Sequence, residues 1–384
     1  MLKSLLIIIY TITIFLCVST YFLYPFIIWI WGKLFPFRVT RRNIVPFVSI
    51  IIPAYNEAKN IEKKVKNTLS LDYPKEKMEI LIGSDGSTDE TAQIVQRFLR
   101  GKNFHFFNFK KNRGKTSVQN DLVKKAKGEI LIFTDAASYL NKDAIKKIVR
   151  NFADNRVGCV AGFMRFTNTE ENLTTRSQGI YWRYESKLRD LESRIGQLIG
   201  VDGPLYAIKK DFYIPLEQNI ISDLVTPLLI LEKGKKVILE KEAIVNEAPT
   251  MKSTQEFSTR RRIVLRGLVS LFKYKRLLNP LKNPILAFQI ILHKILRWFV
   301  GPLLLINILT CFLLIKIRPF NWILAAYFLF FLLAILGWIG ERYGVKAKIF
   351  IFPYYFSLVN IAAFKGIIDF LRKKQIITWK PIRN

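Results

Sequence analysis

An uncharged apolar run from Leu5 to Trp31 constrains the fold of this chain more than any other feature. It exceeds the roughly 20 residues that a helix needs to cross a hydrocarbon core about 30 Å thick, so it predicts a membrane anchor over residues 1–32. A cleaved signal peptide would have a shorter apolar region followed by a small-residue cleavage site. Basic residues follow the run instead, so we expect an uncleaved helix with the next segment in the cytoplasm. These residues are Lys33, Arg38, Arg41 and Arg42.

Apolar runs return in residues 296–384. Leu296 to Ile315 and Trp322 to Ile339 each predict a span, and a short turn joins them into a hairpin. A third run, Ile349 to Leu371, contains polar residues, so it either spans or lies at the interface. We favour the interface, because a span would place the basic tail outside, against the positive-inside rule. This tail contains Arg372, Lys373, Lys374, Lys380 and Arg383.

Between the middle of the chain and the hairpin, residues 252–295 begin with a basic amphipathic segment. The whole chain has 60 Lys+Arg against 29 Asp+Glu, a net charge of +31. In this segment, basic residues alternate with apolar residues. The pattern predicts helices that lie at the membrane interface and contact anionic lipids. Nucleic acid is the other ligand that would explain the charge, but no nucleic-acid motif accompanies it, and we expect no such partner. The apolar residues are Ile263, Val264, Leu265, Leu268, Leu271 and Phe272.

In residues 33–251, β-branched or aromatic runs alternate with polar periodic segments. This alternation predicts an α/β domain with a largely parallel sheet, whose ligands bind beyond the carboxyl ends of the strands. The predicted strands are Val48 to Pro53, Ile80 to Gly83, Phe104 to Phe109 and Glu129 to Thr134.

Acidic residues follow three of these strands, and they indicate what the edge of the sheet binds. Glu57 comes after the first strand, Asp85 after the second and Asp135 after the fourth. Asp85 can accept hydrogen bonds from a base or ribose, and Asp135 can hold a divalent cation that neutralises a pyrophosphate. Lys115 offers a cation to phosphate oxygens. The edge therefore predicts a nucleotide-diphosphate site, although each residue alone could be a turn residue, a helix cap or a solvated charge.

Five motifs together resemble the family 2 glycosyltransferases with the GT-A fold, specifically the membrane-embedded polysaccharide synthase-like branch. The resemblance runs from about Val48 to the C-terminus and implies a Rossmann-like GT-A domain and an inverting hexosyltransferase. The motifs are Ile52-Pro53-Ala54-Tyr55-Asn56-Glu57, Ser84-Asp85-Gly86-Ser87-Thr88-Asp89-Glu90-Thr91, Asn112-Arg113-Gly114-Lys115, Ala126-Lys127-Gly128-Glu129 and Gly200-Val201-Asp202-Gly203-Pro204-Leu205-Tyr206-Ala207-Ile208.

The resemblance also implies roles for single residues. Asp223, in Ile221-Ser222-Asp223-Leu224, is similar to the family's catalytic base, which takes the proton from the acceptor hydroxyl; a helix N-cap is the plainer interpretation. The implied acceptor-binding residues are Trp182, Asp202 and Gly203, and packing on an amphipathic face explains Trp182 equally well. The implied donor-binding residues are Pro53, Ala54, Tyr55, Glu57, Asp85, Lys115, Asp135 and Arg262.

Two motifs depart from the family pattern. Asp135-Ala136-Ala137 lacks the second carboxylate of the Asp-x-Asp motif, so we expect Mg²⁺ or Mn²⁺ at Asp135 but bound more weakly. Thr259-Arg260-Arg261-Arg262-Ile263 has Thr and Ile where processive synthases have Gln and Trp. Arg262 can still meet a diphosphate, but the aromatic residue that would stack on the acceptor is absent, which leaves processivity open.

Three hypotheses follow from these motifs. The first is a bacterial inner-membrane enzyme that uses a nucleotide sugar, with UDP as the expected nucleotide, to extend an envelope polysaccharide from the cytoplasmic side. The second is the transfer of one sugar to a membrane lipid, such as a polyprenyl phosphate or a glycerolipid. The third is an inactive protein that binds nucleotide sugar, and it is disfavoured by the presence of Asp85, Asp135 and Asp223.

Overall fold

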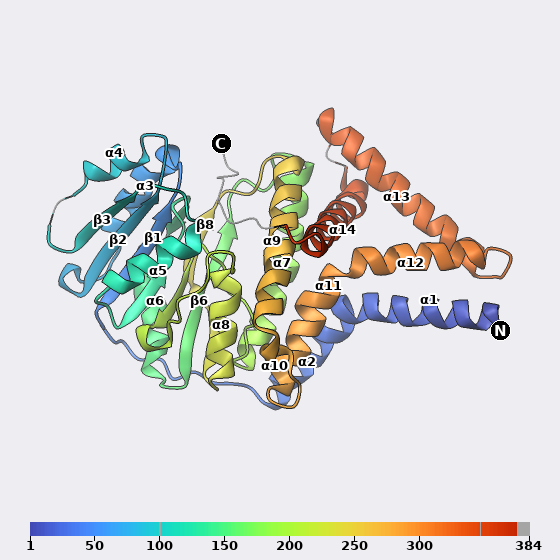
Figure 1. Ribbon diagram of the computed structural model, residues 1–384, viewed down its shortest axis with the longest axis horizontal. Coiled ribbons are helices and arrows are strands. Elements are labelled where there is room, and N and C mark those ends of the chain that lie inside the picture. The colour runs from blue at the N-terminus through green and yellow to red at the C-terminus, as the bar shows by residue number, and fades with distance from the viewer. Residues whose placement is uncertain (100, 346, 375–384) are drawn as a thin grey trace.

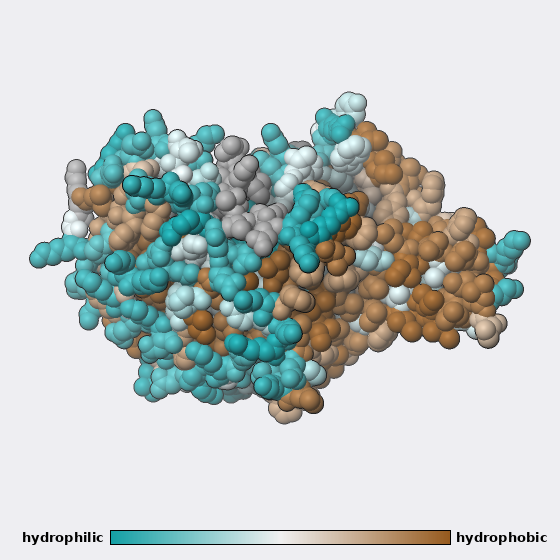
Figure 2. All heavy atoms as spheres, viewed as in Figure 1, coloured by the Kyte–Doolittle hydropathy of each residue, from teal (hydrophilic) through white to brown (hydrophobic). Residues whose placement is uncertain are grey.

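The computed structural model describes residues 1–99, 101–345 and 347–374. A domain built on one sheet lies at one end of the molecule and apolar helices extend from the other end (Figure 1). Hydrophobic residues cover the surface of the extended helices, whereas hydrophilic residues cover most of the visible sheet domain (Figure 2). The molecule is therefore divided into a water-facing part and an apolar part.

The N-terminal apolar run lies in a single helix from Leu2 to Leu34, long and apolar enough to cross a membrane. It comprises α1 (Leu2–Val18), a π-helical turn (Ser19–Leu23) and α2 (Tyr24–Leu34). The helix bends at the π-helical turn. As a result α1 extends away from the sheet domain, whereas α2 runs beside the domain (Figure 1). A π-helical turn followed by Pro25 accounts for the change in direction.

The predicted first four strands are confirmed, and they form a parallel half-sheet. Apolar β1 is buried along its whole length because helices cover both faces of this half. Ile50 and Ile52 face a core shared with α3 (Ala58–Leu69), α4 (Thr91–Gln96) and α6 (Ala144–Val149), and Ile51 faces the core of α5 (Lys115–Lys125) and α8 (Ser222–Glu232). The strands are β1 (Val48–Ala54), β2 (Met78–Asp85), β3 (Phe104–Phe109) and β4 (Ile130–Phe133).

Beyond β4 the sheet becomes mixed, which differs from the largely parallel sheet expected. The strand order is β3-β2-β1-β4-β7-β6-β8-β5, and β7 runs antiparallel to both β4 and β6. The added strands are β5 (Ser138–Leu140), β6 (Val157–Phe166), β7 (Tyr206–Lys209) and β8 (Lys236–Glu247).

Two long helices separate the sheet from the apolar helices. Helix α7 (Leu173–Arg194) begins with a capping box, in which Asn172 and Thr175 exchange side-chain to backbone hydrogen bonds. Helix α9 (Ser253–Lys273) contains the basic segment. Both run across the ends of α1 and α12 (Val300–Leu313), so they form a layer between the two parts (Figure 1).

By length and composition, three helices of the described residues can cross a membrane, or four if a bent pair is one span. The bent pair differs from the predicted span Leu296 to Ile315. Its first arm, Pro284–Trp298, contains α10 (Pro284–Gln289), a π turn (Ile290–Ile295) and α11 (Leu296–Trp298), and α12 leaves it at 60°. The other candidate spans are Leu2–Leu34, α13 (Phe320–Arg342) and α14 (Lys348–Leu371).

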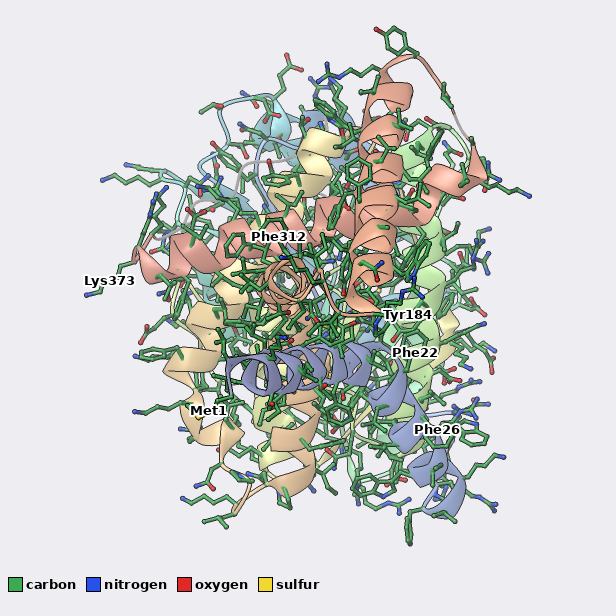
Figure 3. All side chains as sticks on the ribbon, turned by 90° about the vertical axis from the view of Figure 1, so that its right-hand side faces the viewer. Met1, Phe22, Phe26, Tyr184, Phe312 and Lys373 are labelled. Carbon is green, nitrogen blue, oxygen red and sulfur yellow. The ribbon has the colours of Figure 1, made fainter. Side chains whose placement is uncertain are left out.

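Helix α14 lies crosswise to α1 and α12. Figure 1 looks nearly down the axis of α14, while α1 and α12 lie in the plane of the picture. In Figure 3, α14 lies in the plane of the picture, and α1 and α12 extend toward the viewer. It packs on α9, where Val264 and Leu268 meet Ala363 and Ile367. The apolar face that we assigned to a leaflet is therefore partly covered by protein, although Phe272 stays 71% exposed. The basic tail beyond residue 374, with Lys380 and Arg383, lies outside the described residues.

Candidate active site

A cavity of about 450 Å³ lies between the edge of the sheet and the apolar helices. Its walls come from the sheet domain, from α7 and α9, and from α14. Seven of the site residues expected from the sequence line it, so the fold gathers positions that are separated by up to 147 residues. They are Lys115, Asp135, Trp182, Asp202, Gly203, Asp223 and Arg262.

Lys115, Asp135 and Asp223 meet at the centre of this cavity. Lys115 is the first residue of α5, and its Nζ lies 2.5 Å from Asp135 Oδ1. Asp223 lies in the first turn of α8 rather than at its N-cap, which excludes the plainer interpretation of this residue. A Cβ atom at Gly203 would lie 2.7 Å from Lys115 Nζ, 3.0 Å from Asp135 Oδ2 and 3.3 Å from Asp223 Oδ2. The three charged groups therefore crowd around a point that only glycine leaves open.

The electrostatics of this centre suit proton transfer. Burial raises the pKa of Asp223, and nearby Asp135 adds to that effect while Lys115 opposes it. The carboxylates Asp135 and Asp223 in turn outweigh burial at Lys115 and raise the pKa of its amine. A carboxylate whose pKa is raised is a better proton acceptor than an ordinary Asp.

Asp85 holds the loop that carries Lys115. Its Oδ1 and Oδ2 accept hydrogen bonds from the backbone N–H groups of Arg113, at 2.8 Å, and Gly114, at 2.7 Å. Gly114 has a φ of +88°, which glycine adopts without strain. Asp85 is fully buried and does not line the cavity, so its clearest role in the structure is to fix the start of α5.

The other donor residues expected from the sequence also lie outside the lining of the cavity. Pro53 and Ala54 end β1, and Tyr55 and Glu57 follow in the loop before α3. This loop is tied to the loop after β2, because Asp89 accepts the N–H of Ala58 and Thr91 Oγ1 accepts the N–H of Glu57. The two loops thus form one rigid edge beside the cavity, and donor binding there stays a prediction.

Two acceptor-side residues are fixed by contacts between α7 and its neighbours. Asp202 pairs with buried Arg189, and the Trp182 indole N–H donates to the Met164 carbonyl at 2.9 Å. Trp182 also meets Phe166 edge to face, with ring centroids 5.6 Å apart. Its ring is therefore held in one position on the wall of the cavity.

A buried ionic network on the membrane-facing side of the cavity was not anticipated as a unit. Glu185 pairs with Arg297 at 2.7 Å and with His293 Nε2 at 3.3 Å, and His293 Nδ1 lies 2.6 Å from Glu192. Glu185, Arg189 and Glu192 recur at helical spacing, which places them on one face of α7. The sequence shows this helical spacing of charged residues. It does not show that His293 and Arg297 lie against that face of α7.

The fit of a divalent cation can be judged from the acidic groups. No group of three or more His, Cys, Asp or Glu side chains that could hold a metal occurs among the described residues. Asp135 and Asp223 nonetheless converge at Gly203, where Asp135 Oδ1 is paired with Lys115 Nζ. Two carboxylates suit a cation whose remaining ligands are water and substrate phosphates. The residues fit such a cation, provided that Lys115 moves aside.

Comparison with known proteins supports the sequence resemblance. Residues 49–212 match the family described as glycosyl transferase family 2. The poly-beta-1,6-N-acetyl-D-glucosamine synthase of Staphylococcus epidermidis is 27% identical over 197 residues, which are 48% of this chain and 47% of that protein. The synthase of the same name from Staphylococcus aureus (strain COL) is 34% identical over 122 residues, 32% of this chain and 29% of that protein. The chain spans about half the length, or less, of these relatives.

The fold is similar to that of a solved glycosyltransferase. The mannosyltransferase PcManGT from Pyrobaculum calidifontis, in complex with GDP-Man and Mn²⁺, superposes with a TM-score of 0.73 at 22% identity. The match covers 95% of this chain and 99% of that chain. The GT-A-like α/β domain with long apolar helices is thereby confirmed, and residues 49–212 are similar to family 2 of the glycosyltransferases.

Proposed function

We propose that the protein is an inverting glycosyltransferase that moves a sugar from a nucleotide sugar, with UDP as the expected nucleotide, to an acceptor held at the membrane. The observation that carries this proposal is the convergence of Lys115, Asp135 and Asp223 at Gly203, inside a cavity that continues to the apolar helices. The family match of residues 49–212 supports the reaction class.

In this proposal Asp223 takes the proton from the acceptor hydroxyl as its oxygen attacks the anomeric carbon, and the nucleoside diphosphate leaves with the electron pair of the broken bond. Arg262 and Lys115 stand in the same cavity and stabilise the charge of the leaving diphosphate. Mg²⁺ or Mn²⁺ bound at Asp135 would neutralise part of that charge.

The acceptor is the open part of this function. A growing envelope polysaccharide is the first candidate, and the names of the staphylococcal relatives support it. A membrane lipid, such as a polyprenyl phosphate or a glycerolipid, is the second. It is favoured by one specific observation, since Val359, Asn360 and Ala363 of α14 and Tyr21 of the N-terminal helix line the same cavity as Asp223.

We place the sheet domain on the cytoplasmic side of a bacterial plasma membrane, where nucleotide sugars are made. The basic residues at the end of α2 and directly after it support this orientation. The crosswise direction of α14 supports its placement along the interface, so that α1 and the hairpin would do the spanning (Figure 3).

The test is a turnover assay on the full chain in lipid nanodiscs, with a panel of UDP- and GDP-sugars, Mg²⁺ or Mn²⁺, and bacterial lipid extract. We expect labelled sugar to enter either a polymer or the lipid phase, and product size separates the two acceptors. Asp223→Asn should abolish transfer while donor binding is retained, whereas the exposed control Asp211→Asn should transfer normally. Turnover in Asp223→Asn at the wild-type rate would refute the proposed base.

A further inference from the structure

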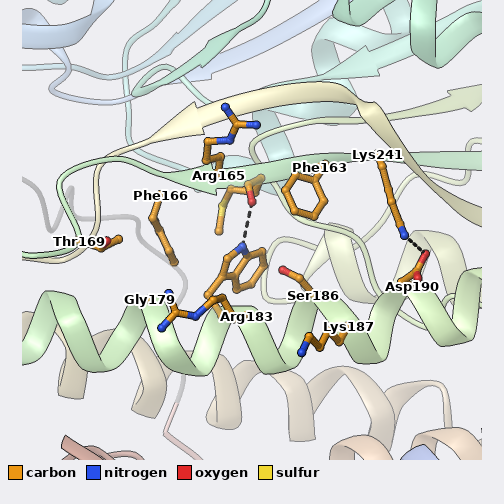
Figure 4. A pocket seen from close by; sticks show the side chains of 12 residues that line it. Phe163, Arg165, Phe166, Thr169, Gly179, Arg183, Ser186, Lys187, Asp190 and Lys241 are labelled. Carbon is orange, nitrogen blue, oxygen red and sulfur yellow. Dashed lines mark hydrogen bonds and ion pairs between the residues drawn. The ribbon is translucent and has the colours of Figure 1, made fainter. Parts of the chain in front are cut away.

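A second cavity of about 460 Å³ lies beside the catalytic one, between α7 and the strands β6 and β8 (Figure 4). The two cavities share Met164, Phe166 and Trp182 in their linings, so they meet at one aromatic wall. Neither the proposed proton transfer nor donor binding uses this second cavity, which we name the α7 groove.

The α7 groove combines aromatic rings with polar groups. Figure 4 shows Phe163 and Phe166 on the strand side of the groove and Ser186 on the helix side. Trp182 also lines the groove and meets Phe166 edge to face. All three rings are only partly buried, so each leaves apolar surface open to a ligand. Partly open aromatic faces suit the C–H face of a sugar ring, while hydroxyl and carboxylate groups such as Ser186 and Asp190 suit its hydroxyls.

The rim of the groove is positively charged. Arg165, Arg183, Lys187 and Lys241 line it and are exposed, whereas Asp190 is its acidic residue. Asp190 is already neutralised by Lys241 at 2.7 Å and by Arg194 at 2.8 Å. Among the described residues, no ion pair is recorded for Arg165, Arg183 or Lys187. These cations therefore favour an anionic occupant.

We infer that the α7 groove binds an acidic stretch of the acceptor glycan, next to the part of the glycan that reaches Asp223. Aromatic faces alone would suit a neutral glycan, and cations alone would suit any anion. Their combination next to the catalytic cavity selects a saccharide that carries carboxylate or phosphate groups. This inference rests on the proposed function for its link to the reaction, but binding to the groove can be measured without turnover.

The test uses hexagalacturonate as the acidic probe and cellohexaose as a neutral probe of equal length, each titrated by calorimetry into the full chain in nanodiscs. We expect hexagalacturonate to bind and cellohexaose to bind about tenfold more weakly or not at all. Raising the salt concentration to about 0.5 M should weaken the binding of the acidic probe, because salt screens exposed charges.

Two variants locate the binding site. Arg183→Gln combined with Lys187→Gln removes two rim charges and should weaken the binding of hexagalacturonate about tenfold. Phe163→Ala should weaken the binding of hexagalacturonate and any binding of cellohexaose. The matched control is Arg97→Gln combined with Lys102→Gln, which removes two exposed charges at the opposite edge of the sheet and should leave binding unchanged. Folding of each variant is checked by its unfolding midpoint.

The outcomes separate the inference from the proposed function. Equal binding of the two probes, or equal loss in the control variant, overturns the acidic-glycan site. Absence of probe binding in a preparation that transfers sugar overturns the inference and leaves the proposed function standing. Specific probe binding in a preparation that binds no nucleotide sugar supports the groove as a glycan site and overturns the proposed enzyme.

Discussion

Lys64 offers the sharpest test of how the catalytic edge is held together. It lies on α3, is fully buried, and donates hydrogen bonds from Nζ to Thr134 Oγ1 and to the Ser138 carbonyl, both at 2.7 Å. It thus bridges the two sides of the turn that contains Asp135. Burial lowers the pKa of Lys64 from 10.5 to about 7, although the charges of Asp135 and Glu247 oppose this.

The pH dependence follows from this shift. The pKa is about 7 in the folded protein and 10.5 in the unfolded chain, so between these values the unfolded chain binds more protons. The free energy of unfolding therefore rises with pH across this window by about 1.4 kcal/mol per unit, or about 5 kcal/mol in total. As pH falls, this stability is lost progressively, and the loss levels off below about pH 7.

The perturbation is Lys64→Met, which keeps most of the side-chain volume and removes the titration. It also removes two hydrogen bonds at about 1 kcal/mol each, so the absolute stability changes as well. The informative quantity is the slope of the unfolding free energy between pH 7.5 and 9.5. We expect this slope to fall by about 1 kcal/mol per pH unit in the variant.

The assay is denaturant unfolding followed by tryptophan fluorescence, with EDTA present so that no divalent cation shifts the charge at Asp135. The matched control is Lys59→Met on the same helix, where the lysine is exposed. Other titrating groups affect all three proteins alike, so the difference between variants isolates Lys64. Identical slopes for Lys64→Met and Lys59→Met would refute the account of a buried, largely neutral lysine.

Three further predictions concern the cavity. Gly203→Ala puts a Cβ 2.7 Å from Lys115 Nζ, so turnover should fall about tenfold with little change in the unfolding midpoint. Unchanged kinetics would contradict the crowding of charged groups around Gly203. Glu185→Gln leaves Arg297 and His293 without their shared carboxylate and should lower the free energy of unfolding by about 3 to 5 kcal/mol. The exposed control Glu171→Gln should leave the free energy of unfolding unchanged. Because burial raises the pKa of Asp223, kcat/KM should fall on acidification at a higher pH than an ordinary Asp would give; an acid limb at the ordinary value would argue against this base.

Much of the fold could be predicted because its signals are local. The alternation of apolar runs with polar periodic segments predicts β1 to β4, since burial on both faces demands continuous apolar strands. Polar residues after those strands predict the site, because parallel strands bring their carboxyl ends to one edge. Asp135, which follows β4, lies in the cavity, whereas Glu57 and Asp85 lie outside its lining.

The limits of the sequence show in residues whose partners are far along the chain. The donor-binding role of Asp85 stays a prediction, and the sequence did not show that its carboxylate accepts the N–H groups of Arg113 and Gly114. Lys64 is an ordinary member of a charged helix in the sequence, and only the fold buries it. A side chain's type states which interactions it can make, but not which partner the fold brings within reach.

The sequence by itself determined that the chain has an α/β domain similar to family 2 of the glycosyltransferases, with apolar segments long enough for a membrane near both ends. Tertiary structure decided how those segments are used. Hydropathy is the same whether an apolar face meets lipid or protein, so it could not show that α14 covers the apolar face of α9 or that α12 leaves the preceding helix at 60°. The joining of the two cavities at Trp182 likewise depends on the packing of α7 against β6, which no local pattern encodes.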